Sequence, residues 1–139
     1  MPRSRAILRS KSILVVDENA YVALDLAAAV EAKGGTVLGP VGSVDEALSH
    51  LAANRVDAAI LDGDLGGAAA IAARLSSQQI PFVVQGGTTL TVGLRGLCDR
   101  SAMLTRPVDS TLVVTLLAIE LEKDADRTPL PMPLPPIRA

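Results

Sequence analysis

Five short apolar runs, separated by segments with helical features, most constrain what this chain can fold into. The runs span residues 12–16, 36–41, 56–61, 81–85 and 101–105. They lack a regular alternation of polar and apolar residues, which is typical of strands covered on both faces of a parallel sheet. The pattern predicts an α/β fold in which a doubly wound five-stranded parallel sheet has helices on both faces.

The residues between the runs carry the signals of helices. Ser43 and Glu46 have the spacing of a capping box, so a helix is expected to begin at Ser43 and to run through Leu51. Further helices are predicted over residues 20–33, over about 68–77, weakly over 90–98, and from Asp109 to about Glu122. The run at 36–41 contains Gly39 and Pro40, which favours a strand at the edge of the sheet.

The two ends of the chain differ in composition from its middle. Residues 1–10 are basic and are predicted to form a short leader before the first strand. Residues 123–139 carry five prolines between Pro129 and Pro136, which predicts a tail in polyproline or disordered form. The folded domain is therefore expected over residues 11–122.

Composition excludes several classes of function. Tyr21 and Phe82 are the only aromatic residues, and 13 basic residues face 15 acidic ones. A nucleic-acid partner is therefore not expected, because base stacking needs aromatic rings and polyanion binding needs a basic surface. No apolar run has the length of a membrane span, so no membrane partner is expected. The single cysteine, Cys98, cannot form an internal disulfide, which suits the reducing cytosol and predicts a cytoplasmic protein.

Charged residues follow several of the predicted strands. Asp17 and Glu18 follow the first strand, Asp62 the third and Arg106 the fifth. In a doubly wound sheet the functional site lies at this edge, so the carboxylates and the guanidinium are expected to converge. Oxygen ligands favour a hard cation such as Mg²⁺, and a carboxylate beside such a cation can attack a phosphoryl group. Taken singly, an acidic pair can be a helix cap and the arginine a surface residue; their joint placement favours a site.

Four segments resemble a known family. They read ILVVDEN (13–19), DAAILDGDLGG (57–67), IPFVVQGG (80–87) and LTRPVD (104–109). In this order and spacing, over about residues 11–122, the chain resembles the receiver domain of two-component response regulators. The resemblance implies a flavodoxin-like sheet in the order 2-1-3-4-5 and a signalling role rather than an enzymatic one. It also implies a histidine kinase or a phosphotransfer protein as partner.

The resemblance assigns roles to individual residues. Asp62 is expected to be the phosphoacceptor. Glu18 and Asp62 are expected to ligate Mg²⁺ directly, Asp17 to act through water, and Asp64 to contribute its backbone carbonyl. These roles follow from matching positions in the family pattern.

Three positions depart from that pattern. Gly86 stands where the family has a hydroxyl residue, Arg106 where it has a lysine, and Met103 where it has an aromatic switch residue. Gly86 has no side chain to move, and the planar fork of arginine differs from a compact ammonium group. Thr88 or Thr89 could supply the missing hydroxyl.

Three functions follow as hypotheses. The favoured one is a stand-alone receiver that takes a phosphoryl group on Asp62 from a histidine-kinase partner and acts through protein contact. The alternative is a phosphorylation-independent interaction module. A haloacid-dehalogenase-like phosphatase is less favoured: Asp62-Gly63-Asp64 resembles its signature, but that signature normally follows the first strand.

The last predicted helix is apolar on more than one stripe. A helix that covers a sheet needs only one apolar stripe, so part of this surface is expected to stay exposed after folding. A homodimer or a partner contact through this helix is the favoured explanation. Cover by the Pro-rich tail is the alternative.

Overall fold

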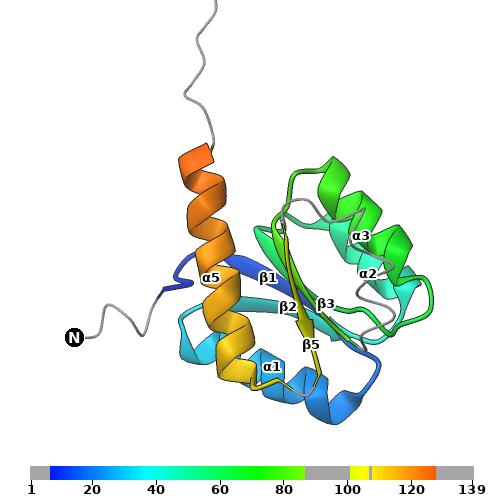
Figure 1. The fold of residues 1–139 in the computed structure, drawn as a ribbon. Coiled ribbons are helices and arrows are strands. Elements are labelled where there is room, and N and C mark those ends of the chain that lie inside the picture. Colours follow the sequence, from blue (N-terminus) through cyan, green and yellow to red (C-terminus); the bar gives the residue numbers. More distant parts are fainter. Residues whose placement is uncertain (1–6, 87–100, 107, 128–139) are drawn as a thin grey trace, which may run out of the picture.

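The computed structural model describes residues 7–86, 101–106 and 108–127, and it contains a single parallel sheet flanked by helices (Figure 1). The strands are β1 (Ser12–Val16), β2 (Thr36–Val41), β3 (Ala58–Asp62), β4 (Phe82–Gly86) and β5 (Ser101–Thr105). The helices are α1 (Ala20–Ala32), α2 (Val44–Ala53), α3 (Ala68–Ser77) and α5 (Ser110–Arg127). The order of the strands is β2-β1-β3-β4-β5, and all neighbours are parallel. The fold class and strand order predicted from the sequence are confirmed, including the edge position of β2.

Two apolar layers hold the sheet between its helices. The helices α1 and α5 lie on one face, and α2 and α3 lie on the other (Figure 1). Successive residues of a strand point to opposite faces, so Leu61 packs towards α2 and α3 while Ile60 packs towards α1 and α5. This double cover explains why the strands are continuously apolar.

Local signals in the sequence set several helix ends. The side chain of Ser43 accepts a hydrogen bond from the backbone N–H of Glu46 at 3.2 Å. The carboxylate of Glu46 in turn accepts one from the N–H of Gly42 at 3.1 Å. The predicted capping box is therefore present. It differs in one contact, because the carboxylate of Glu46 bonds the N–H of Gly42 and not that of Ser43, the residue at the N-cap. Asp109 likewise accepts from the N–H of Thr111 at the start of α5.

Some boundaries differ from those predicted. Strand β3 starts at Ala58 rather than at residue 56. Just before it, the side chain of Asp57 accepts a hydrogen bond from the backbone N–H of Ser12 at 2.7 Å. Helix α5 continues to Arg127, five residues beyond the predicted end. Residues 123–127 contain neither proline nor glycine, so nothing in that stretch stops a helix. The weak helix predicted over 90–98 lies outside the described residues.

The end of the predicted leader belongs to the folded domain. Leu8 is fully buried against the core that faces α1 and α5. Its backbone N–H donates to the carbonyl of Lys33 at 2.9 Å. A side chain on Gly35 would lie within 3.1 Å of Leu8, so the segment is tightly packed there. The folded unit therefore begins before residue 11.

None of the helices in the described part of the chain has the length and apolarity that crossing a membrane requires.

Candidate functional site

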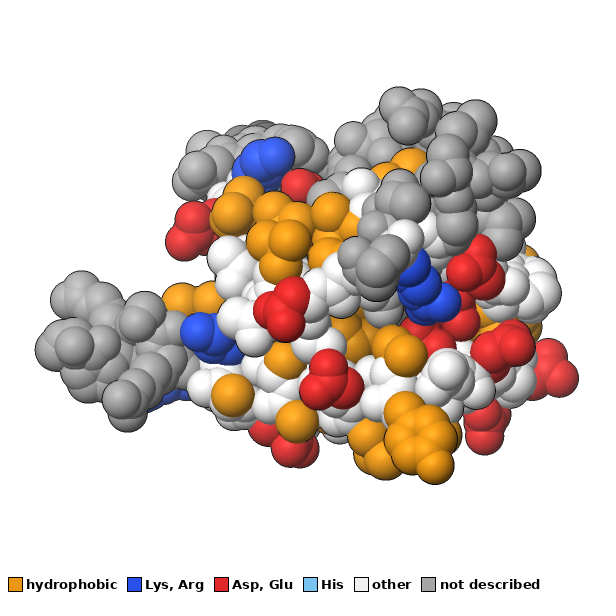
Figure 2. Space-filling view, turned by 60° about the horizontal axis from the view of Figure 1, so that its bottom comes forward, with side chains coloured by type: hydrophobic (Ala, Val, Ile, Leu, Met, Phe, Trp, Pro, Cys, Tyr) orange, Lys and Arg blue, Asp and Glu red, His pale blue; other side chains and the backbone are white. Residues whose placement is uncertain are grey.

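The strand ends meet where the fold places them. Asp17 and Glu18 follow β1, Asp62 ends β3, Gly86 ends β4 and Arg106 follows β5. Since these strands are neighbours in a parallel sheet, their carboxyl ends lie along one edge. On the face seen in Figure 2, a small area of basic side-chain atoms touches acidic side chains.

Arg106 joins three carboxylates at this edge. Its Nη2 atom lies 2.7 Å from Oδ2 of Asp17 and 3.2 Å from Oδ1 of Asp62. Its Nη1 atom lies 3.3 Å from Oδ2 of Asp64. We call Asp17, Asp62 and Asp64 the acid cluster. The planar guanidinium spans the cluster because its nitrogens are held in a fixed fork.

The two carboxylates nearest the sheet are buried. Asp17 is 2% exposed and Asp62 is 1% exposed. Asp62 accepts hydrogen bonds from the backbone N–H of Asp64 at 2.9 Å and from that of Glu18 at 3.3 Å. Asp17 accepts one from the N–H of Asn19 at 2.9 Å. Backbone donors and Arg106 thus replace the water that these carboxylates lose on folding.

Burial raises the pKa of the Asp17 carboxyl above 3.8, its ordinary value. The negative charge of Asp62 and a side-chain hydrogen bond between the two carboxyls act in the same direction. The N–H of Asn19 and the charge of Arg106 act against them without cancelling them. The ionised form of Asp17 is therefore less favourable in the folded chain than in the unfolded one.

We expect Asp17→Asn to leave the fold at least as stable as the wild type at neutral pH. The folded chain holds the Asp17 proton to higher pH than the unfolded chain does. Stability is therefore expected to fall as pH rises from 3.8 through the raised pKa. In Asp17→Asn, the fall in stability that comes from the titration of Asp17 should be absent. Urea unfolding of both proteins at several pH values between pH 4 and pH 8 measures this pH dependence. A clear loss of stability in Asp17→Asn at pH 7 would show that its ion pair with Arg106 outweighs the cost of burial.

Glu18 does not bring its side chain into the cluster. The residue is exposed, and its hydrogen bond to Asp62 is donated by its backbone N–H. Within residues 7–86, 101–106 and 108–127, no group of three or more His, Cys, Asp or Glu side chains is arranged to hold a metal ion. The oxygen donors have the chemistry that Mg²⁺ prefers, but Nη2 of Arg106 stands between Asp17 and Asp62. As arranged, the residues do not fit a divalent ion.

Gly86 faces the acid cluster with no side chain. A Cβ atom built at this position would lie 3.1 Å from Oδ1 of Asp64 and 3.3 Å from the Cα atom of Gly63. A serine or threonine here would crowd Asp64, so the cluster and the glycine fit one another as they stand. Thr88 and Thr89, which could supply a hydroxyl, lie outside the described residues, as does Cys98.

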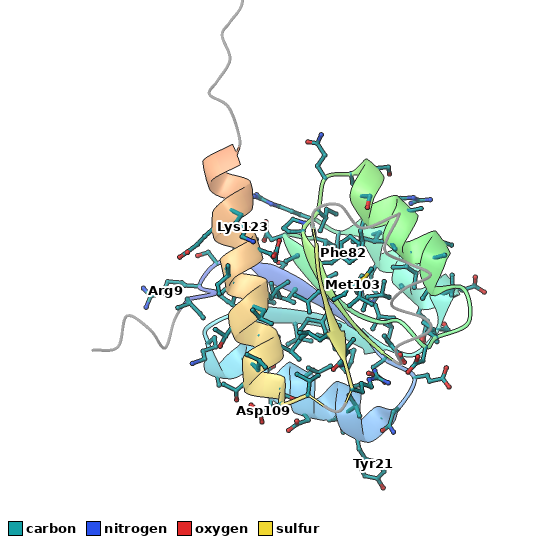
Figure 3. The ribbon with its side chains drawn as sticks, in the orientation of Figure 1. Arg9, Tyr21, Phe82, Met103, Asp109 and Lys123 are labelled. Carbon is teal, nitrogen blue, oxygen red and sulfur yellow. The ribbon has the colours of Figure 1, made fainter. Side chains whose placement is uncertain are left out.

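Met103 lies on β5 and is half-buried against the core that faces α2 and α3. Its side chain and that of Phe82 are drawn in Figure 3. A half-buried thioether packed in this way fills space, and it carries no hydroxyl or aromatic ring to relay a movement.

Two features of the site escaped the sequence analysis. The side chain of Asp64 takes part through Arg106, whereas only its backbone carbonyl was expected. Gln85, paired in register with Asp62, is a buried amide, and its Nε2 has no hydrogen-bond partner in the described part of the chain. A glutamine at the end of the apolar run FVVQ was the available signal, because a buried polar residue at a strand end is uncommon.

The comparison with solved structures finds the same fold in many proteins. A response regulator receiver domain protein from Methanospirillum hungatei JF-1 superposes with a TM-score of 0.73 at 17% identity, over 85% of this chain and 98% of that one. A receiver protein from Sinorhizobium medicae WSM419 gives 0.70 at 21% identity, over 82% and 96% of the two chains. A Burkholderia pseudomallei response regulator, solved with a phosphorylated aspartic acid, a calcium ion and citrate, gives 0.66 at 22% identity, over 88% and 78%.

No family model matches the sequence, and neither does any curated protein. At these identities the structural likeness establishes the fold, and the chain has the receiver-domain fold. The resemblance stated from the four sequence segments is confirmed at that level.

Proposed function

We propose that this chain is a phosphorelay receiver whose Asp62 accepts a phosphoryl group from a histidine kinase or a phosphotransfer protein. One observation supports the proposal most: Asp62 ends the central strand of a receiver fold, with its carboxylate beside Asp17 and against Arg106. One structure with this fold is described as carrying a phosphorylated aspartic acid.

The proposed transfer needs a nucleophile and a positive charge. A carboxylate oxygen of Asp62 attacks the phosphorus of a phosphohistidine, the new O–P bond forms, and the P–N bond breaks with its electron pair leaving on the imidazole nitrogen. Negative charge then increases beside the acid cluster. The guanidinium of Arg106 lies 3.2 Å from Asp62 and is therefore placed to stabilise this negative charge.

A partner has an apolar surface to contact next to the cluster. Tyr21 is 87% exposed and Leu24 is 62% exposed on α1, and Tyr21 points away from the body of the protein (Figure 3). A pocket of about 270 Å³ beside them is lined by residues that include Asp17, Glu18 and Pro40. Exposed apolar side chains at the rim of a charged site suit a protein rather than a small substrate.

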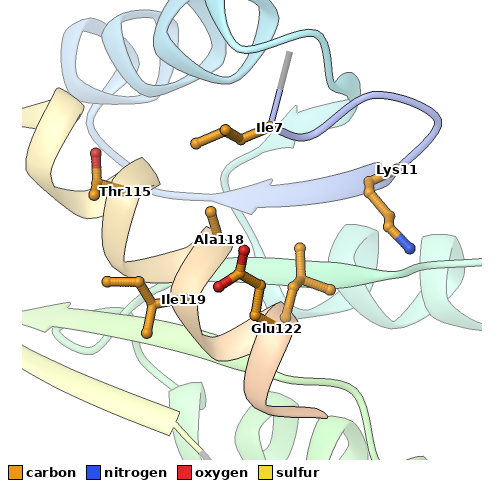
Figure 4. Close-up of a pocket in the computed structure, with 7 residues that line it drawn as sticks. Ile7, Lys11, Thr115, Ala118, Ile119 and Glu122 are labelled. Atoms are coloured by element: carbon orange, nitrogen blue, oxygen red, sulfur yellow. The ribbon is translucent and has the colours of Figure 1, made fainter. Parts of the chain in front are cut away.

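The surface of α5 agrees with the expectation of exposed apolar residues. Leu112 and Ile119 remain exposed. Helix α5 forms a groove of about 340 Å³ with Ile7 and Lys11. Ile119 and Ala118 are among the residues that line it (Figure 4). We propose a contact of this chain with a second copy or with an output partner here. The cover by the tail stays an untested alternative.

Phosphorylation is tested by intact-mass analysis after incubation with a small phosphodonor, with and without Mg²⁺. We expect one phosphoryl adduct in the wild type and none in Asp62→Asn, because the amide is not a comparable nucleophile. Asp45→Asn is the matched control, since Asp45 is an exposed aspartate on α2 and should keep the adduct. An adduct that persists in Asp62→Asn would assign the phosphorylation to another residue.

A second candidate function is phosphorylation-independent binding. It is favoured by the engagement of Asp62 with Arg106 and by the absence of a side chain at Gly86. In that case the folded wild type takes up no phosphoryl group, and Asp62→Asn binds the same partner as the wild type does. The phosphatase alternative loses support, because the Asp62-Gly63-Asp64 segment follows the third strand of a receiver fold. We propose a non-enzymatic role; the cytoplasmic location remains a prediction.

A further inference from the structure

The acid cluster already contains a cation, and that cation belongs to the chain. Nη2 of Arg106 is within ion-pair distance of Asp17 and Asp62 at once, while Nη1 contacts Asp64. The side chain of Arg106 is 27% exposed, so it lies over the buried carboxylates with one side towards solvent. Its Nε atom is buried, with no hydrogen-bond partner among the described residues. The guanidinium is therefore held by its two terminal nitrogens.

A divalent ion shared by Asp17 and Asp62 would need the same place. Mg²⁺ draws its oxygen ligands to about 2.0–2.1 Å, with near-octahedral geometry. Nη2 is 2.7 Å from Asp17 and 3.2 Å from Asp62, so both oxygens already point at the nitrogen. An ion at that point would meet the charge of Arg106 within a few ångströms, where like charges repel strongly. The two cations therefore exclude each other.

We infer that Arg106 is the built-in counter-cation of the acid cluster and that it keeps Mg²⁺ only weakly bound. Mg²⁺ binds tightly when Arg106 has left the position between Asp17 and Asp62. The inference concerns the same site as the proposed function, but it is drawn from the unmodified carboxylates and does not depend on phosphoryl transfer to Asp62. It revises the expectation from the sequence that Glu18 and Asp62 ligate Mg²⁺ directly.

The test is a Mg²⁺ titration of the full chain at constant ionic strength, with NaCl as the compensating salt. It compares the wild type, Arg106→Ala, Arg106→Lys and Arg74→Ala. Arg74 is an exposed arginine on α3, so its removal lowers the net charge by the same amount away from the cluster. Two readouts are used: the melting temperature, and the amide NMR signals of Gly63 and Asp64, which lie next to Asp62.

The wild type and Arg74→Ala should show only small changes at millimolar Mg²⁺. Arg106→Ala should bind Mg²⁺ at least roughly tenfold more tightly, since a unit positive charge beside the ion has gone. Its melting temperature should rise with Mg²⁺, because an ion that binds the folded state stabilises it. Adding Asp62→Asn to Arg106→Ala should remove the rise and the shifts at Gly63 and Asp64, which places the ion at the cluster.

Arg106→Lys decides the matter if Arg106→Ala does not fold without the metal. A single ammonium nitrogen cannot span three carboxylates as a guanidinium does, so this variant should bind Mg²⁺ more tightly than the wild type. If the wild type binds Mg²⁺ at Gly63 and Asp64 as tightly as both Arg106 variants do, the inference is wrong. If the Mg²⁺ titration gives the expected result but the wild type takes up no phosphoryl group, only the proposed function is overturned.

Discussion

Replacing Arg106 by alanine is expected to lower the free energy of unfolding by about 3–5 kcal/mol at neutral pH in the absence of divalent ions. The side chains of Asp17 and Asp62 are 0% and 2% exposed, so they would remain buried without the cation that contacts both. Removing one partner of a buried ion pair leaves the other charge buried without compensation. The loss of stability is therefore larger than the net stabilisation that the intact pair provides.

The loss should depend on pH with a definite sign. The charge of Arg106 lowers the pKa of Asp17, so its removal should raise that pKa further above 3.8. When the pKa of a carboxyl is higher in the folded state than in the unfolded state, protonation of that carboxyl stabilises the folded protein. The deficit of Arg106→Ala is therefore expected to shrink as the pH falls from 7 towards the folded-state pKa.

Urea unfolding of Arg106→Ala and Arg74→Ala at two pH values measures both effects. The control should stay within about 0.5 kcal/mol of the wild type, because Arg74 lies on an exposed part of α3. At neutral pH, Arg106→Ala could lose no more free energy of unfolding than Arg74→Ala does. That result would mean that Arg106 does not stabilise the acid cluster.

Replacing Leu8 by alanine is expected to lower the free energy of unfolding by about 2–5 kcal/mol. Leu8 is fully buried, and it packs so closely on Gly35 that a methyl group there would press on its side chain. Truncation to alanine leaves a cavity between the amino-terminal segment and the end of α1. The cost depends on how far the neighbouring side chains close that cavity.

Ile7→Ala is the matched control for Leu8→Ala. Ile7 is the preceding residue, is 40% exposed, and lines the groove beside α5 (Figure 4). Its truncation should cost less than that of Leu8, because a residue that is already 40% exposed removes less apolar surface from water on folding than a fully buried one does. Denaturant midpoints of the two variants give the comparison. A loss in Leu8→Ala as small as the one expected for Ile7→Ala would show that residues 7–10 belong to a leader outside the folded domain, as predicted from their composition.

Much of the fold could be predicted from the sequence, because the signals for strands and helix ends lie within a few residues of one another. A buried parallel strand must be apolar on both faces, so five unbroken runs identify five strands. The Ser43 and Glu46 pair marks a helix start within four residues of chain. The convergence of Asp17 and Asp62 also followed, since parallel strands place their carboxyl ends at one edge.

The contacts that give the site its character join residues far apart in the chain. Arg106 reaches Asp64 across 42 positions and Asp17 across 89. The sequence placed the guanidinium opposite the carboxylates. It did not show that one fork would contact all three, because the path of an arginine side chain depends on the neighbours that surround it. The exclusion of Glu18 from the cluster has the same origin: its backbone, not its side chain, turns towards Asp62.

The sequence by itself determined the layered α/β architecture, the edge where the acid cluster lies, and the capping of α2. The tertiary structure alone decided that Arg106 occupies the centre of that cluster, that Gly86 has little room for a side chain beside Asp64, and that Leu8 is core. Periodicity and capping depend on residues a few positions apart, so a linear pattern records them. Burial and ion pairing depend on which distant segments the fold brings into contact, and only the folded chain sets those distances.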